Sequence, residues 1–171
     1  MISLVLIGGW LGASGPAEAG CFMSCTLADL QNATLLDDSA VREAARRCKA
    51  SCETESKIRL GVREAAVQAC RPTPLPPEAM ARVQAASPRF QILLGVFAWE
   101  TVNPFPDKVL KGISVSRMTP TLARQDFETA GTVGPNEQGA FVVTDMGELI
   151  PQLGPTIRVT GILACDLPPA P

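Results

Sequence analysis

The spacing of apolar residues changes near residue 89 and divides the chain into a helical part and a strand-rich part. Over residues 20–71, Leu, Ala, Ile and Val recur three or four positions apart among charged residues, which is typical of amphipathic helices. Asp37-Asp38-Ser39 interrupts this pattern and offers N-caps, so we expect two helices joined by a turn. The second helix, from Ala40 to Cys70, contains Gly61, which predicts a bend where another element packs closely. Beyond residue 57 its apolar residues at helical spacing are Ile58, Val62, Ala65 and Ala69.

Residues 72–88 contain a proline-rich link and then a short helix, expected from Glu78 to Ala86. Over residues 89–166 apolar residues form short runs or alternate with polar ones, and turn residues lie between them. This pattern predicts strands over 90–99, 109–118, 124–133, 140–144 and 156–165. In the last strand we expect Ile157, Val159, Leu163 and Cys165 to share one face. Residues 167–171 are expected to form a frayed tail.

The strand-rich part resembles a small antiparallel β-sandwich of the immunoglobulin or fibronectin type III kind. The segment AWETVNPFPDKVLKGISVS carries this resemblance, because it is similar to a strand, turn and strand of such modules. We therefore expect an α+β fold, with an antiparallel helical hairpin followed by a β-sandwich.

Four of the six cysteines form two C-x-x-x-C pairs, Cys21 with Cys25 and Cys48 with Cys52. Residues four positions apart share one face of a helix, and the two pairs are symmetric about one turn, so the spacing predicts two disulfides across the hairpin. This arrangement resembles the twin-CX3C proteins, such as the small Tim chaperones of mitochondria. The resemblance covers residues 21–52 and implies that Cys21 pairs with Cys52 and Cys25 with Cys48; only this disulfide pattern is carried over.

The remaining cysteines, Cys70 and Cys165, end the long helix and the last strand. We expect them to pair and to tie the helices to the sheet. A metal site for zinc or an iron–sulfur cluster, or redox exchange, is the alternative role for the C-x-x-x-C cysteines.

Residues 1–19 are expected to be an export signal, because an apolar run from Ile2 to Leu11 precedes the cleavage pattern Ala17-Glu18-Ala19. Two other readings remain open: an uncleaved anchor, and a lipidated Cys21, since Ala19-Gly20-Cys21 is similar to the end of a bacterial lipobox. Either would place the protein near a membrane. An even number of cysteines suits an exported chain, so we expect a periplasmic or extracellular location at a bacterial envelope.

The composition of the chain disfavours several classes of function. Lys and Arg number 15 against 17 Asp and Glu, which gives a net charge of −2 and disfavours a general electrostatic attraction to nucleic acid. The chain has no His, the commonest general base and metal ligand. An exported enzyme that uses only carboxylates, such as a glycan hydrolase, stays open. Its candidate residues are Asp107, Asp126, Glu128, Asp145 and Glu148.

We therefore expect a non-catalytic binding or structural protein without a cofactor, an accessory subunit or adaptor of an envelope-associated assembly. A redox or metal-handling protein is the alternative. A basic cluster on the second helix is either a solvated helix face or a contact for an acidic partner or anionic lipid headgroups: Arg42, Arg46, Arg47 and Lys49. Four aromatic residues are expected in the sandwich core, or else as an exposed patch: Phe90, Phe97, Trp99 and Phe105.

Overall fold

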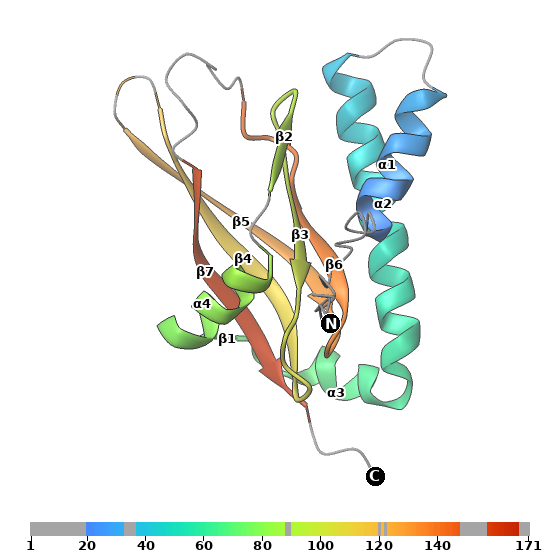
Figure 1. The fold of residues 1–171 in the computed structure, drawn as a ribbon, viewed down its shortest axis with the longest axis vertical. Helices are drawn as coiled ribbons and strands as arrows, with labels where there is room; N and C mark the ends of the chain where they lie inside the picture. The colour runs from blue at the N-terminus through green and yellow to red at the C-terminus, as the bar shows by residue number, and fades with distance from the viewer. Residues whose placement is uncertain are drawn as a thin grey trace, which may run out of the picture.

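The computed structural model describes residues 20–32, 37–87, 90–119, 121, 123–147 and 157–167. The expected export signal, the tail beyond Leu167 and Glu148 lie outside these residues. Among the described helices none is both long and apolar enough to cross a membrane. The fold belongs to the α+β class, with helices followed by antiparallel sheets (Figure 1).

Two helices, α1 (Cys21–Gln31) and α2 (Asp38–Leu60), lie side by side along one flank of the molecule (Figure 1). Asp37 caps α2, because its carboxylate accepts a hydrogen bond from the Ala40 N–H at 2.8 Å. Hydrogen bonds from the Ser39 hydroxyl and from this N–H lower the pKa of the Asp37 carboxyl. The cap therefore starts α2 where the sequence predicts it.

The predicted long helix bends at Gly61, where φ is +53°. A short 3₁₀ turn, η1 (Gly61–Arg63), and α3 (Glu64–Ala69) follow. The bend is confirmed, but the close packing expected at Gly61 is wrong, since a Cβ there would meet nothing within 4 Å. The residue is suited to this position by its conformational freedom, because φ > 0 is unfavourable for other residues.

The apolar repeat predicted for the second half of this helix is also wrong. Ile58 is 72% exposed, and Ala65 and Ala69 are exposed too. Leu60 and Val67 instead pack in a small cluster with Val109, a strand residue, and Leu167, which follows the last strand. The bend at Gly61 rotates the contact face, so a repeat drawn through it as one straight helix fails.

The strands form two antiparallel sheets. The four-stranded sheet has the order β1 (Thr73–Pro74), β7 (Ile157–Asp166), β4 (Lys108–Met118) and β5 (Arg124–Val133). The three-stranded sheet has the order β2 (Gln91–Leu93), β3 (Val96–Val102) and β6 (Gln138–Val143). The single strand predicted over 90–99 is therefore wrong: it is the hairpin of β2 and the start of β3, turned by Leu94 and Gly95, whose φ angles are +45° and +76°.

The main core lies between the two sheets. β3 and β6 contribute Phe97, Trp99, Phe141 and Val143, and the strands of the other sheet contribute Leu110, Ile113, Val115, Val133 and Ile162, among others. Helix α4 (Pro77–Ala86) adds Ala79 and Val83 to this core, and Pro77 occupies its first turn as expected. Phe97, Trp99 and Phe105 are buried as predicted, whereas Phe90 is 40% exposed.

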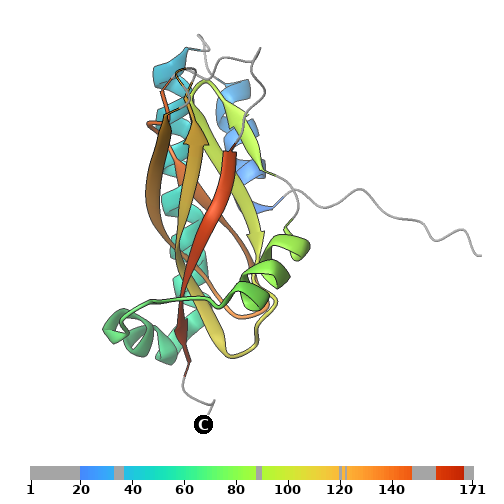
Figure 2. The same cartoon turned by 90° about the vertical axis from the view of Figure 1, so that its left-hand side faces the viewer.

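The helices α1 and α2 pack against the other face of the three-stranded sheet. The alternate residues of β3 and β6 point this way, and Val96, Ala98, Ala140 and Val142 form one cluster with Phe22, Val41, Ala45 and two cysteines. The elements thus lie in three layers: two helices, a three-stranded sheet and a four-stranded sheet (Figures 1 and 2).

The predicted face of the last strand holds only in its first part. Ile157 and Val159 belong to the main core, but Ile162 and Ala164 follow them there in place of Leu163 and Cys165. The pairing of β4 with β7 shifts between Ser114 and Val115, which indicates a bulge in β7. The bulge reverses the alternation and turns Cys165 away from the core, toward α3.

One buried side chain, Asn103, joins the loops at the end of the sheets. Its Nδ2 lies 2.8 Å from both Lys108 O and Gly134 O, and its Oδ1 accepts from the Phe105 N–H at 3.1 Å. Asn103 is 0% exposed, so water cannot replace the hydrogen bonds that its side chain makes to these backbone groups.

We predict that Asn103→Ala lowers the free energy of unfolding by about 2–4 kcal/mol, because it leaves several buried backbone groups unpaired. Urea denaturation followed by tryptophan fluorescence measures this change. The matched control is Asn32→Ala, whose amide makes one exposed hydrogen bond to Ala28 O; we expect a loss of about 0.5 kcal/mol or less. Equal losses in the two variants would contradict the role assigned to Asn103.

Candidate functional site

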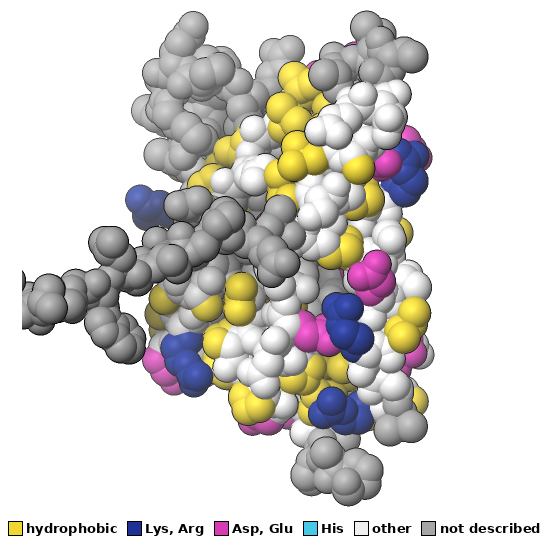
Figure 3. Space-filling view, turned by 45° about the vertical axis from the view of Figure 1, so that its right-hand side comes forward, with side chains coloured by type: hydrophobic (Ala, Val, Ile, Leu, Met, Phe, Trp, Pro, Cys, Tyr) yellow, Lys and Arg dark blue, Asp and Glu magenta, His cyan; other side chains and the backbone are white. Residues whose placement is uncertain are grey.

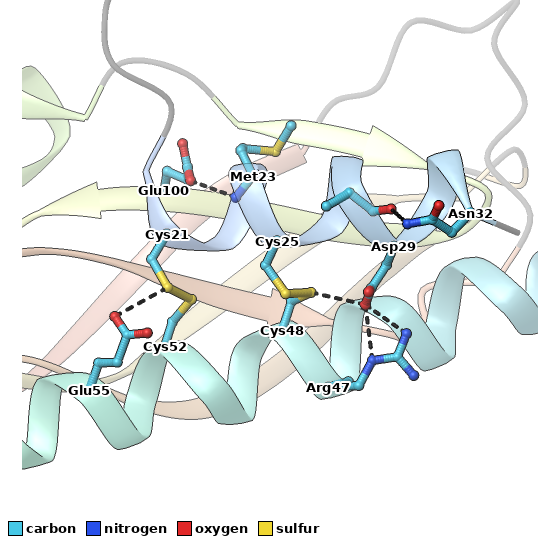
Figure 4. The surroundings of a disulfide bond; sticks show 11 residues. Cys21, Met23, Cys25, Asp29, Asn32, Arg47, Cys48, Cys52, Glu55 and Glu100 are labelled. Carbon is cyan, nitrogen blue, oxygen red and sulfur yellow. Dashed lines mark hydrogen bonds and ion pairs between the residues drawn. A yellow bond between two sulfur atoms is a disulfide. The ribbon is translucent and has the colours of Figure 1, made fainter.

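Three disulfides join the six cysteines: Cys21–Cys52, Cys25–Cys48 and Cys70–Cys165. Their Cα atoms lie 5.9, 5.6 and 6.2 Å apart. The first two link α1 to α2 one turn apart (Figure 4), and the third links the segment after α3 to the end of β7. All three predicted pairings are present. The Cys21 sulfur that lipidation would require is used in the first of them.

A metal-ligand geometry exists at the second disulfide, where atoms of Cys25, Asp29 and Cys48 lie within 4.8 Å of one another. Disulfide sulfurs are not thiolates, so they are poor metal ligands. The Asp29 carboxylate instead accepts two hydrogen bonds from Arg47, at 2.6 Å from Nη2 and 3.0 Å from Nε (Figure 4). With the Cys25–Cys48 disulfide formed, Asp29 and Arg47 are an ion pair beside it. Metal binding at this position would require reduction of the disulfide.

Three of the four residues in the predicted basic cluster pair with carboxylates. Arg42 pairs with Asp38 at 3.4 Å, Arg47 pairs with Asp29, and Lys49 pairs with Glu53 at 3.5 Å. Arg46 is exposed and makes no ion pair with any residue that the structure describes. Only Arg46 and Lys49 of the four line a common groove.

This groove, which we call the α2 groove, has a volume of about 350 Å³ and lies between α2, β5 and β6. Its lining residues are Arg46, Lys49, Phe127, Glu128, Thr129, Val142, Val143, Thr144 and Asp145. Of the predicted carboxylates, the fold brings Glu128 and Asp145 to this groove. Asp107 is not among its lining residues, and Asp126 pairs with Arg124 at 2.8 Å.

The position of α2 over the strands is fixed by a polar contact at the β5–β6 turn. Glu137 accepts hydrogen bonds from the Ser56 hydroxyl and from Arg59 Nε, both at 2.8 Å. The bond to Glu137 raises the pKa of the Arg59 guanidinium. Nearby, burial lowers the pKa of the Lys111 ammonium, which donates to the Thr132 hydroxyl at 3.2 Å. The hydrogen bonds from Ser56 and Arg59 to Glu137 hold α2 in place as one wall of the α2 groove.

Large apolar side chains are exposed on α1 and around β2. Leu27 of α1 is 50% exposed, and at the β2–β3 hairpin Phe90, Leu93 and Leu94 are 40%, 48% and 43% exposed. Figure 3 shows hydrophobic side chains gathered in the upper part of the face that α1 and β2 share. We call these four residues the apolar surface.

Sequence reasoning kept Phe90 as part of an exposed patch in one of its two alternatives, but it missed Leu93 and Leu94, because it treated residues 90–99 as one strand. The one signal in the sequence is Gly95, which follows Leu93-Leu94 within the apolar run and permits a tight turn. A turn at that position places the preceding leucines at the tip of a hairpin, away from the core.

Comparison with known proteins gives no relative for this chain. No family model matches it, and neither does any curated protein or solved structure.

We predict that the purified native protein, denatured without a reductant and treated with iodoacetamide, gains no alkyl group in its intact mass, since no cysteine that the structure describes is free. Reduction before alkylation should add six groups and is the positive control. Three or more groups without reduction, or zinc or iron retained in the native protein, would support redox or metal handling instead.

Proposed function

We propose that this chain is an exported, non-catalytic binding protein, an accessory subunit or adaptor of an envelope-associated assembly. In this proposal the apolar surface contacts a protein partner. The observation that carries it is the exposure of Leu27, Phe90, Leu93 and Leu94 on α1 and around the β2 edge. Phe90 stacks on Phe97 at 5.4 Å and Leu93 pairs with Val96, so the exposed side chains lie on both sides of this edge. Large exposed apolar groups on a folded domain are typical of interaction sites.

The conformation of Leu94 supports a binding role. Its φ of +45° lies in the left-handed region, which is unfavourable for a residue with a branched side chain. Asn, Asp or Gly would suit this turn better and would be more soluble. A leucine here has an unfavourable backbone conformation and exposes an apolar side chain to water. Contact with a partner would offset both costs.

The free edge of β2 supports the same role. β2 is an outer strand of its sheet, and its neighbours at both ends are exposed apolar residues. Edge strands usually carry charges, prolines or bulges that prevent pairing with other chains. β2 reads Gln91-Ile92-Leu93 and carries no charge or proline, but its three residues offer another chain only a short edge, so its side chains are the main contribution to docking.

We further infer that the scaffold is a disulfide-linked helical hairpin carried by an immunoglobulin-like or fibronectin-like β-sandwich. Two sheets around one core and two helices joined by two disulfides support this inference. The three disulfides are consistent with an oxidising, exported location. Such a rigid scaffold presents surfaces, as expected of an adaptor.

A redox or metal-handling protein is the second candidate, favoured by the cluster of Cys25, Asp29 and Cys48. Reduction of one disulfide would release two thiolates beside a carboxylate, which together can hold zinc. The alkylation experiment described above distinguishes this candidate from a binding protein.

The binding role is tested by affinity capture from native envelopes, with cross-linking and quantitative mass spectrometry. We predict that Leu27→Ser combined with Leu93→Ser reduces the captured partner about tenfold or more, because each buried interface leucine contributes on the order of 1 kcal/mol or more. Both side chains are about half exposed in the free protein, so their loss should leave the fold intact.

Ile58→Ser is the matched control, because it removes an aliphatic side chain that is 72% exposed and lies outside the apolar surface. It should leave capture unchanged. Equal capture by all three proteins would refute a binding role for the apolar surface, and equal loss in both variants would indicate nonspecific adhesion.

A further inference from the structure

The α2 groove has a charge arrangement that the apolar surface lacks. Its basic side chains, Arg46 and Lys49, come from α2, whereas its acidic side chains come from β5 (Glu128) and from the segment after β6 (Asp145). Among the residues that the structure describes, no ion pair joins the two basic side chains to the two acidic ones. Lys49 pairs with Glu53 at 3.5 Å, and Arg46 makes no ion pair with any described residue, so charges of opposite sign border the groove without direct contact across it.

Between these charges the groove offers apolar and hydroxyl groups. Phe127, Val142 and Val143 supply apolar surface, and Thr129 and Thr144 supply hydroxyls. A volume of about 350 Å³ is within the range of small-ligand sites and accommodates a few residues of a peptide. A partly apolar lining with a few polar groups is the usual composition of a binding site.

Two sheet edges meet at this groove. β5 is the last strand of the four-stranded sheet and β6 is the last strand of the three-stranded one. The Thr129 hydroxyl donates to Val142 O at 2.8 Å, so this carbonyl of β6 points toward β5 and not toward β3. This carbonyl is therefore already hydrogen-bonded across the seam between the two sheets, and a ligand in the groove would meet mainly the side chains that line it.

We propose that the α2 groove binds an extended peptide segment of a partner protein, with an acidic residue directed to Arg46 and Lys49 and a basic residue directed to Glu128 and Asp145. Successive side chains of an extended chain point in opposite directions. The two charged residues therefore stand at adjacent positions or another odd spacing. A ligand with negative charge alone would meet the acidic side of the groove and is disfavoured.

This site is separate from the apolar surface. The three-stranded sheet has the order β2, β3, β6, so the apolar surface lies at its β2 edge and the groove at its β6 edge. The residues that line the α2 groove are not those of the apolar surface. The result of the capture experiment therefore does not decide whether the groove binds a peptide.

The test is an NMR titration of the full, disulfide-intact ¹⁵N-labelled protein with two blocked five-residue peptides of identical composition. In the first, an aspartate directly precedes a lysine between valine and threonine residues; in the second, one threonine separates the two charges. We expect saturable shifts for residues of α2, β5 and β6 with the first peptide, and binding about threefold to tenfold weaker with the second.

Arg46→Gln and Glu128→Gln should each weaken binding of the first peptide by a similar factor, about threefold to tenfold. Both positions are exposed, so the variants should fold as the native protein does. Arg42→Gln is the matched control, because it removes a basic side chain of α2 that does not line the groove; its affinity should stay unchanged.

Several results would overturn the proposal. They are the absence of saturable shifts, equal affinity for the two peptides, and shifts confined to α1 and β2. Binding of free aspartate or lysine as tight as that of the peptide would assign the groove to a small zwitterion instead. Saturation of the same residues by inorganic phosphate or by vesicles with anionic phosphatidylglycerol would assign it to an anion.

Discussion

Burial of the three-stranded sheet on both of its faces is the constraint on which the other features depend. Phe97, Trp99 and Phe141 fill the space between the sheets, and the residues that alternate with them lie under the helices. Neither face of β3 or β6 is available to solvent over most of its length. The sheet is therefore stable only with the helices in place.

The covalent and polar links hold the helices in that position. Two disulfides fix α1 to α2, and Glu137 binds Ser56 and Arg59 so that α2 stays over the β5–β6 turn. In addition, the Met23 N–H donates to Glu100 of β3 at 3.0 Å and ties α1 to the sheet. Helix α1 has only 11 residues and would be marginal in isolation, so it depends on these links and on the burial of Phe22.

Much of this fold can be predicted from local sequence signals. The cysteine spacing, the Asp37 cap, the first turn of α4 and the strands that begin near Val109 and Arg124 all depend on neighbouring residues, and the structure confirms them. The errors occur where tertiary packing decides. Residues 90–99 form a continuous apolar run because β3 is buried on both faces, and the run conceals the turn at Leu94 and Gly95.

The candidate sites were harder to predict for the same reason. Arg42, Arg46, Arg47 and Lys49 look alike in sequence, and only packing of α2 against β5 and β6 separates the two that line the groove from the two that do not. Glu128 and Asp145 are 17 positions apart, so no motif joins them before the strands are placed.

The two edges of the three-stranded sheet differ in the chemistry they present. The β2 edge offers large apolar side chains, whereas the groove at the β6 edge is lined by both signs of charge and by apolar residues. Apolar surfaces give affinity with little dependence on salt, and charged grooves give selectivity and faster association. In the roles proposed above, two such surfaces on opposite edges of one sheet would engage two different segments, as an adaptor requires.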